Sequence, residues 1–223
     1  MRQTLITGTG SYLPERIITN DDLAACMDTS DEWIRQRTGI GQRHMVAEGQ
    51  KTSDLAIAAG EKALEHAGLN ATDLDCIIIA TTTPDDTFPA TAATVQAGLG
   101  ASNAFAFDVQ AVCAGFVYGL DVGDSMVKCG KANKALVIGA ESFTRILDWE
   151  DRSTAVLFGD GAGAVVLEAS EDHDGWGILS STLYTDGRFK DILYVDGGVS
   201  STGTVGHVRM KGRAVFRHAV EKL

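Results

Sequence analysis

Short apolar runs alternate with longer segments of helical periodicity along most of the chain. Runs this short and rich in β-branched residues suit buried strands, so we expect strands at residues 4–7, 76–80, 104–108, 134–138 and 162–167. Apolar residues recur at helical spacing over residues 53–67, 90–99 and 114–128, which predicts three helices. This alternation is typical of a layered α/β fold.

Glycine and serine residues punctuate these segments. Ser53 is the expected N-cap of the first helix, and Gly68, Gly100 and Gly130 are expected to end the three helices in turn. Two glycine-rich segments, 8–10 and 159–163, are interpreted as tight turns. The first lacks the third glycine of a dinucleotide fingerprint and the second lacks the Lys-Ser/Thr of a phosphate loop, so neither pattern favours dinucleotide binding.

A second unit is expected after the charged segment 168–175, which contains Ser, Asp and Gly and is typical of a linker. The domain boundaries predicted from it are 1–170 and 171–223. The second unit should begin with a strand at 177–184, continue through an irregular glycine-rich stretch at 186–206 and end in an amphipathic helix from Gly212. Because no stop signal follows that helix, we expect the chain to be truncated within it.

Composition and charge narrow the function classes. The 223 residues are 44% hydrophobic and 22% charged, as in globular proteins, and contain no apolar run long enough for a signal peptide or a membrane span, so a cytoplasmic protein is expected. The formal charge of −11 disfavours nucleic acid and anionic membranes as partners. Residues 207–223, however, hold five basic residues against one acidic residue; this suits an acidic or phosphate-bearing partner, or simply a solvated helix face.

Cys113 is the cysteine whose setting indicates chemistry. It follows the predicted strand 104–108 and a sharp turn, at the start of the predicted helix 114–128, where unpaired N–H groups and the helix dipole favour a thiolate. The same turn offers an N–H for an oxyanion, and Ala114 and Gly115 leave space for a thioester. The other three, Cys26, Cys76 and Cys129, are interpreted as buried, inert thiols, and no CxxC or Cys/His spacing indicates a disulfide framework or a metal site.

Several motifs together resemble one enzyme family. They are GTGSYLP at 8–14, TSDEWI at 29–34, RTGI at 37–40, ATTT at 80–83, AVCAGF at 111–116 and FGDGAGA at 158–164. In this order the chain resembles the ketoacyl-acyl-carrier-protein synthase III family. The resemblance implies a thiolase-like fold in an obligate homodimer, with two α/β halves that each hold a five-stranded mixed sheet; here the N-terminal half is complete and the C-terminal half only begun.

The resemblance also implies a reaction. Cys113 accepts the acyl group of acetyl-CoA, and the carbanion from decarboxylation of malonyl-acyl carrier protein attacks it to form acetoacetyl-acyl carrier protein, without a metal or redox cofactor. The family's His and Asn and its second oxyanion donor lie beyond residue 223, so the chain alone is expected to be inactive in condensation. No such role is assigned to any of its histidines, His44, His66, His173, His207 and His218.

Binding residues follow from the same local matches. Trp33 and Arg152 resemble the pair that sandwiches the CoA adenine, which suits a flat ring and a planar guanidinium. Around them the resemblance assigns Arg37 to phosphate, Thr29 to a neighbouring polar contact, Met210, Gly212 and Phe216 to the pantetheine tunnel, and Arg217 to the carrier-protein docking face. It assigns Phe88 to the partner's acyl pocket and Phe143, Phe158 and Leu193 to the pocket of its own subunit, which predicts a short straight-chain starter. For Trp33, Phe116, Phe158 and Phe216, plain core packing is the alternative.

Other functions stay open at this point. A polyketide-type starter synthase or a relative of hydroxymethylglutaryl-CoA synthase would share the fold and Cys113. A nucleotide-binding regulator of the sugar-kinase type would use glycine-rich turns but has no need of a cysteine at a helix start. A non-catalytic interaction protein is the third alternative, and labelling by acetyl-CoA separates the enzymes from the other two.

Overall fold

The computed structural model describes residues 2–171 and 175–222. The chain forms two compact units that alternate along the sequence. The first consists of Met1–Glu15, Val46–Ser142 and Asp160–Leu183, and the second of Arg16–Met45, Phe143–Gly159 and Tyr184–Leu223. The predicted boundary near residue 170, which concerns the two repeated halves of the fold, stays a prediction. None of the helices in the described ranges is both long and apolar enough to cross a bilayer.

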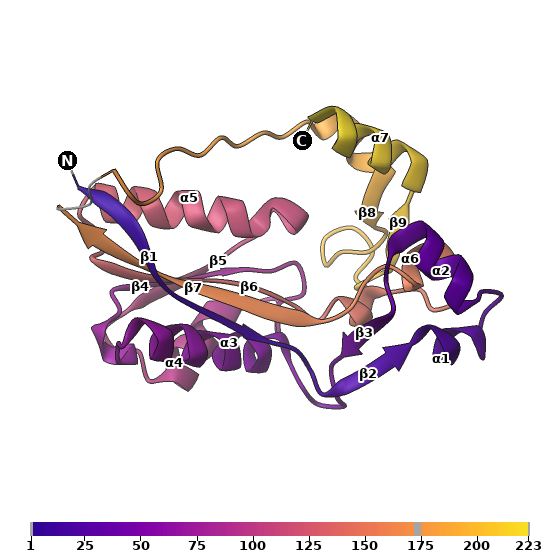
Figure 1. Cartoon of the computed structure of the whole chain (residues 1–223), viewed down its shortest axis with the longest axis horizontal. Helices are drawn as coiled ribbons and strands as arrows, with labels where there is room; N and C mark the ends of the chain where they lie inside the picture. Colours follow the sequence, from indigo (N-terminus) through magenta and orange to yellow (C-terminus); the bar gives the residue numbers. More distant parts are fainter. Residues whose placement is uncertain (1, 172–174, 223) are drawn as a thin grey trace. The chain divides into compact units, whose positions relative to one another are not determined.

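A five-stranded mixed sheet forms the centre of the first unit, as predicted (Figure 1). The spatial order is β1, β7, β6, β4, β5. Strands β6, β4 and β5 are parallel, while β7 is antiparallel to both of its neighbours, β6 and β1. The bounds are Gln3–Tyr12 for β1, Cys76–Ala80 for β4, Phe105–Val109 for β5, Lys134–Glu141 for β6 and Gly161–Ser170 for β7.

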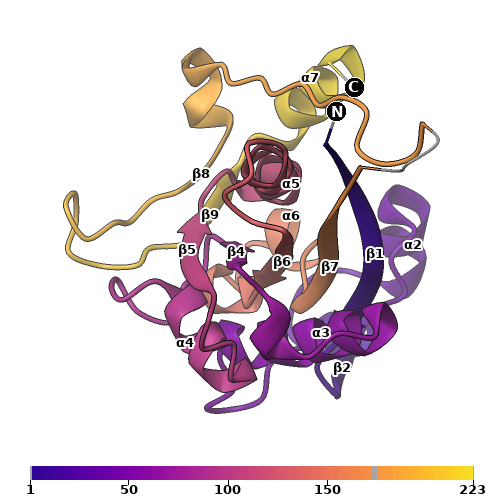
Figure 2. The same ribbon diagram turned by 90° about the vertical axis from the view of Figure 1, so that its left-hand side faces the viewer.

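Helices cover both faces of this sheet. On one face lie α3 (Thr52–Ala67) and α4 (Thr91–Leu99), and on the other lies α5 (Gly115–Lys128) (Figures 1 and 2). The strand β4 serves both layers because its side chains alternate in direction: Ile77 and Ile79 pack in the core beneath α3 and α4, whereas Ile78 packs in the core beneath α5. All three helices begin and end within two residues of the predicted bounds.

Two expectations for the first unit were wrong in their local geometry. The segment 8–10 is the middle of β1, and Gly161–Gly163 opens β7, so neither is a tight turn. Glycine is required in β1 because α3 lies directly against it: a Cβ at Gly10 would stand 2.2 Å from the carbonyl oxygen of Ala59. The glycines of β1 are there because two backbones pack closely. Such packing has no periodic pattern in the sequence, so these glycines resembled those of a turn.

Helix caps and one strand also differ from expectation. The N-cap of α3 is Lys51, two residues before the predicted Ser53. Gly68 and Gly100 end their helices in the left-handed conformation as predicted, while Gly130 follows the actual C-cap, Cys129. The predicted strand at 177–184 does not form; Ile178 N–H donates one hydrogen bond to the Thr4 carbonyl, and no ladder continues from it.

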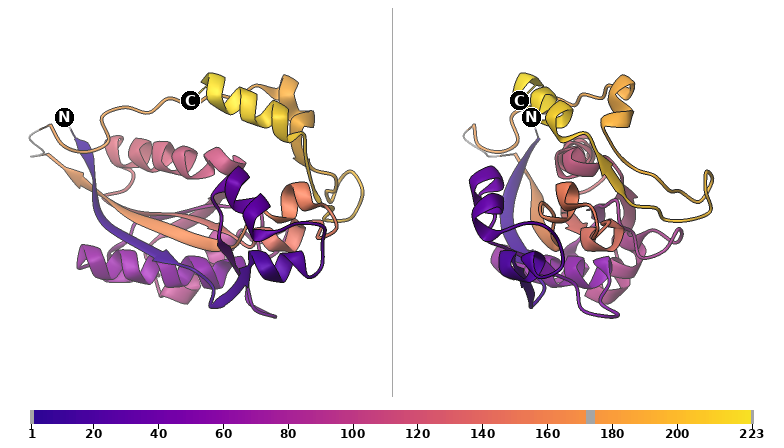
Figure 3. Two further views of the ribbon diagram at one scale, coloured as in Figure 1. Left: turned by 45° about the vertical axis from the view of Figure 1, so that its right-hand side comes forward. Right: turned by 90° about the vertical axis from the view of Figure 1, so that its right-hand side faces the viewer.

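The second unit is built from short elements. A ribbon of β2 (Arg16–Thr19) and β3 (Gln42–Met45) is joined by α1 (Asn20–Ala24) and α2 (Asp31–Thr38). A second ribbon pairs β8 (Leu193–Val195) with β9 (Val208–Met210), and α7 (Gly212–Lys222) follows it as predicted (Figure 3). The short α6 (Arg152–Ala155) completes the unit, and the stretch expected to be irregular contains β8 and a 3-10 turn at Gly187–Ile192.

Candidate active site

Cys113 lies on a strained elbow between β5 and α5. The chain leaves β5 at Val109, forms a 3-10 turn over Val112–Ala114 and enters α5 at Gly115. Val112 has a φ of +51°, which a β-branched residue adopts only under strain. Backbone strain of this kind gathers at functional sites, and here it presents the exposed thiol of the next residue, Cys113.

The rigidity of this elbow comes from close packing of α5 on the sheet. Gly115, Gly119 and Gly123 recur every fourth residue and face the strands; added Cβ atoms would stand 3.3 Å from Ala80 Cβ, 3.0 Å from Val137 Cγ1 and 2.8 Å from Leu167 Cδ1. Gly115 is buried. Its missing side chain therefore serves helix packing, while the expected space for a thioester stays a prediction.

The remaining cysteines are only partly as expected. Cys76 is fully buried in β4, and burial, with a smaller contribution from Asp75, raises the pKa of its thiol to about 12. Cys26 and Cys129 are exposed, so the expectation that they are buried was wrong. Both lie just after the ends of helices, where the side chain reaches a carbonyl that also accepts backbone N–H groups: the Cys26 thiol donates to Leu23 O at 3.3 Å and the Cys129 thiol to Met126 O at 3.5 Å.

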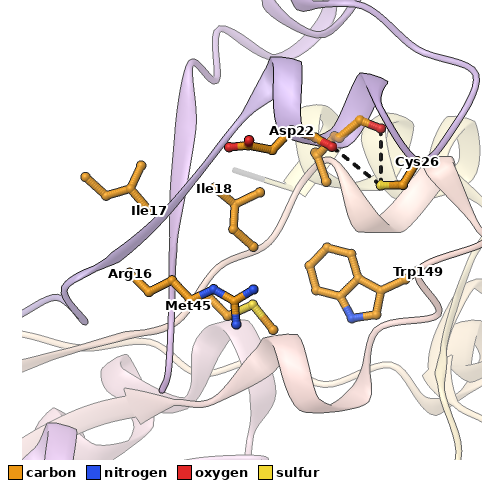
Figure 4. A pocket seen from close by; sticks show the side chains of 8 residues that line it. Arg16, Ile17, Ile18, Asp22, Cys26, Met45 and Trp149 are labelled. Atoms are coloured by element: carbon orange, nitrogen blue, oxygen red, sulfur yellow. Dashed lines mark hydrogen bonds between the residues drawn. The ribbon is translucent and has the colours of Figure 1, made fainter. Parts of the chain in front are cut away.

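Cys26 also lines an open pocket of about 380 Å³ in the second unit (Figure 4). The wall is mostly apolar and comes from β2, α1, β3 and the segment before α6. The lining residues are Arg16, Ile17, Ile18, Asp22, Leu23, Cys26, Met45 and Trp149. None of the residues that the sequence indicated as a site lines this pocket.

The loop that carries Phe88 is anchored at both ends in the first unit. At its start, the Glu141 carboxylate accepts hydrogen bonds from Thr82 N–H (2.7 Å) and the Thr83 hydroxyl (2.6 Å). Burial raises the pKa of Glu141, and these hydrogen bonds oppose the rise. At its end, the Asp108 carboxylate accepts from the Thr91 and Ala92 amides at the start of α4, both at 2.8 Å.

Phe88 itself is 84% exposed on this anchored loop. An aromatic side chain held in water by an ordered loop points to contact with another surface. The sequence reasoning missed Glu141 and Asp108 as anchors. The available signal was that Asp108 ends the predicted strand 104–108 and that Glu141 closely follows the predicted strand 134–138.

Trp33, on α2, is in contact with two arginines. The guanidinium carbon of Arg37 is 4.4 Å and that of Arg152 is 5.1 Å from the Trp33 ring centroid, within the range of cation–π attraction. Arg152 also donates to the backbone carbonyl of Asp28 and lies 3.3 Å from its carboxylate. The predicted pair is thus brought together, and Thr29 lies next to Asp28 with a buried hydroxyl that has no hydrogen-bond partner.

The spacing of this cluster has a consequence for ligand binding. Stacked planar groups need about 3.5–4.0 Å per layer, so a purine between Trp33 and Arg152 requires a separation of about 7–8 Å. The observed separation of 5.1 Å is smaller. Arg152 therefore has to withdraw from the ring before a purine can enter.

The predicted acyl-pocket residues of the second unit also lie together. The Phe143 and Phe158 rings are 4.5 Å apart between centroids and tilted by 37°. Leu193 packs with them on the buried side chains of Ile146, Leu147 and Val208. Phe116, for which core packing was the alternative, packs in the core beneath α5.

The residues assigned to the pantetheine tunnel and the docking face lie on β9 and α7. Met210 is half-buried, and its methyl group lies near the exposed Gly212. Phe216 is 72% exposed and Arg217 is exposed, so Phe216 is not a core residue. The predicted basic end is less positive than its composition indicates. Arg209 forms ion pairs with Asp148 at 2.7 Å and Asp196 at 2.6 Å.

Comparison with known proteins shows the family to which this chain is similar. Residues 107–187 match the family model of 3-oxoacyl-[acyl-carrier-protein (ACP)] synthase III. The β-ketoacyl-[acyl-carrier-protein] synthase III of Paracoccus denitrificans is 59% identical over 226 residues, which cover 100% of this chain and 70% of that protein.

Solved structures give the same result for the fold. The crystal structure of 3-oxoacyl-[acyl-carrier-protein] synthase III from Aquifex aeolicus superposes with a TM-score of 0.90 at 48% identity, covering 96% of this chain and 67% of that one. The priming β-ketosynthase of the R1128 polyketide pathway gives a TM-score of 0.88 at 32% identity, covering 99% and 67%. The fold is thiolase-like, and the chain belongs to the β-ketoacyl-[acyl-carrier-protein] synthase III family of acyltransferases.

Proposed function

We propose that Cys113 accepts the acyl group of acetyl-CoA as a thioester in the first step of a decarboxylative condensation. The supporting observation is the exposed thiol on a strained elbow at the start of α5. Its sulfur attacks the thioester carbonyl, the CoA thiolate leaves, and the acetyl group stays on Cys113. This exchange is redox-neutral and needs only a thiol nucleophile and a donor for the oxyanion, so the proposed step uses neither a metal nor a redox cofactor.

The second substrate in this proposal is malonyl-acyl carrier protein. Loss of CO2 leaves the electron pair that attacks the acetyl-Cys113 carbonyl, and acetoacetyl-acyl carrier protein leaves with the Cys113 thiolate regenerated. Arg217 on α7 is proposed to contact the acidic carrier protein, because it is exposed and lies beside Arg213 and Lys211, which are exposed as well. We infer a cytoplasmic location, where both substrates are made.

CoA is proposed to bind through the second unit. Trp33 and Arg152 stack on the adenine after Arg152 has withdrawn, Arg37 contacts phosphate, and Thr29 supplies its unpartnered hydroxyl. Met210, Gly212 and Phe216 are proposed to line the path of the pantetheine arm. Binding of an aromatic base and phosphate by a cluster of arginines fits the chemistry of a nucleotide.

A homodimer is proposed from the edge of the sheet. β5 is an edge strand of the five-stranded sheet, and Phe105 at its start is 44% exposed. An edge strand that carries an exposed aromatic residue is suited to pairing with a second copy. Phe88 then reaches into the acyl pocket of the other subunit, while Phe143, Phe158 and Leu193 close that pocket from within and favour acetyl or propionyl groups.

Product analysis tests the proposed function against the closest alternative. With acetyl-CoA and malonyl-acyl carrier protein, a form of the protein that spans the whole length of its relatives should release acetoacetyl-acyl carrier protein. A preference for malonyl-CoA as the extender, or hydroxymethylglutaryl-CoA as the product from acetoacetyl-CoA, would replace this assignment with another thiolase-fold condensing enzyme. The Cys113→Ala variant is the control and should form no product.

A further inference from the structure

The second unit contains a buried arginine with no acidic partner. Arg43, on β3, is 5% exposed. In the described part of the chain its guanidinium donates only to uncharged oxygens, those of Ile18, Asn20 and Val156. Burial lowers the pKa of this guanidinium, which reflects the cost of holding a charge away from water. A residue kept at such a cost is expected to hold particular groups in place.

One arm of Arg43 leads to α2. Its Nη1 donates to Asn20 Oδ1 at 2.8 Å. The amide of Asn20, which is 1% exposed, donates in turn to Asp31 Oδ1 and to the Ile40 carbonyl, both at 2.8 Å. Asp31 is the first residue of α2, and Ile40 lies two residues beyond its end. Asn20 therefore holds both ends of the helix that carries Trp33.

The other arm of Arg43 leads to α6. Its Nη2 donates to the Val156 carbonyl at 2.8 Å. Val156 is the C-cap of α6, whose first residue is Arg152. The Val156 side chain is also buried against Ile34 of α2. A single planar fork thus links the helix that carries Trp33 to the helix that carries Arg152.

We propose that Arg43 is a positioning residue for the nucleotide, setting the spacing between Trp33 and Arg152 through Asn20 and Val156. The proposal rests on the proposed function, in which these two side chains bind the CoA adenine. Arg43 does not touch the ligand in this scheme. It limits how far α6 can separate from α2 when Arg152 withdraws.

Single-turnover acetylation of Cys113 tests this role with two donors, acetyl-CoA and acetyl-pantetheine, the second of which lacks the nucleotide. Arg43→Lys keeps the charge but cannot span two acceptors as a fork. For this variant we expect the half-saturating concentration of acetyl-CoA to rise about tenfold, with an unchanged limiting rate. Acetylation by acetyl-pantetheine should be unaffected.

Two further variants keep the test decisive. Asn20→Ala breaks only the arm to α2 and should give a smaller rise of the same kind. Arg16→Lys, the same exchange on the paired strand β2 at an exposed position, should change neither donor. Melting temperatures of all variants report whether folding is affected.

The outcomes distinguish the positioning role of Arg43 from the assignment of Trp33 and Arg152 to the adenine. If Trp33→Ala and Arg152→Ala discriminate between the donors while Arg43→Lys and Asn20→Ala do not, the positioning role is overturned. Equal losses with both donors in Arg43→Lys, or no loss with either, overturn it as well. If Trp33→Ala and Arg152→Ala weaken both donors equally, the adenine assignment is itself wrong and the role of Arg43 falls with it.

Discussion

The elbow of Cys113 in the first unit and the cluster around Trp33 in the second are held in place by different interactions. The elbow follows β5, an edge strand of the mixed sheet, and is held by packing. Here α5 lies so close to the strands that a Cβ at Gly119 or Gly123 would stand 3.0 or 2.8 Å from a strand side chain. The Trp33 cluster packs on a small apolar core and is joined by hydrogen bonds and charges among short elements. Its two arginines, Arg37 and Arg152, are exposed.

This difference suits the two tasks. A nucleophile has to meet one carbonyl in one geometry, which rigid packing provides. The proposed nucleotide site would have to open and close around its ligand, and Arg152 would have to leave Trp33 for this to happen. Mutations should therefore act on stability in the first unit and on ligand affinity in the second.

The largest effect on stability is expected where α3 lies on β1. In Gly10→Ala, the new Cβ would stand 2.2 Å from Ala59 O and 2.4 Å from Ala63 N, both backbone atoms that cannot rotate away. Overpacking of this severity should lower the free energy of unfolding by about 3 kcal/mol or more, measured by urea denaturation. Gly163→Ala is the matched control, because nothing lies within 4 Å of its Cβ position. Equal destabilisation by both would contradict the packing argument.

A smaller effect, on selectivity alone, is expected for the anchored loop. Phe88→Ala should leave stability unchanged because the side chain is 84% exposed. If Phe88 closes a partner's acyl pocket, the variant should accept hexanoyl-CoA better relative to acetyl-CoA by a factor that corresponds to about 1–3 kcal/mol. The ratio of acylation rates for the two donors measures this. An unchanged ratio, or a loss of stability, would show that Phe88 acts within its own subunit.

Release of backbone strain should have a still smaller effect. At a φ of +51° Val112 is strained and glycine is not, but glycine loses more conformational entropy on folding. Strain of 1–3 kcal/mol set against about 0.5–1 kcal/mol of entropy predicts that Val112→Gly raises the free energy of unfolding by about 1 kcal/mol. Acetylation of Cys113 should slow, because the elbow becomes less rigid. Destabilisation by more than the entropy term would mean that Val112 is not strained.

The smallest expected effect concerns pH and the β8–β9 ribbon. Hydrogen bonds from Arg209 and from neighbouring backbone amides hold the pKa values of Asp148 and Asp196 below their ordinary value of 3.8. A lowered pKa gives stability that is present above the unfolded value and is lost as the pH falls through the folded value. The melting temperature should therefore fall less steeply below pH 4 in Arg209→Met than in the wild type, by differential scanning fluorimetry. A parallel pH profile in both proteins would contradict this.

Much of the first unit could be predicted from sequence because local pattern and tertiary structure agree there. The apolar runs and the helical periodicity predicted the five strands and three helices, and the place of Cys113 between a strand and a helix indicated its role. The glycines at positions 8 and 10 led to a wrong prediction of a tight turn, because close packing and turns both favour glycine. In the second unit β2, α1 and α2 were missed, since elements of four to eight residues have too little periodicity to register.

The candidate site was also predicted only in part. Sequence motifs indicated Trp33 and Arg152, but Arg43 escaped because its role depends on the buried oxygens of Asn20 and Val156, far from it in sequence. The burial of Cys26 was predicted wrongly, since a thiol in an amphipathic segment has no local sign of which face it occupies.

The central claim is that the elbow makes Cys113 the acyl acceptor, and one labelling experiment tests it most directly. The protein is incubated with acetyl-CoA, digested, and the acetylated peptide identified by mass spectrometry. The account predicts a hydroxylamine-sensitive acetyl thioester on Cys113, absent in Cys113→Ala and retained in Cys129→Ala, whose thiol is exposed as well. Labelling of Cys26 or Cys129 in place of Cys113, or persistence of the label in Cys113→Ala, would contradict it.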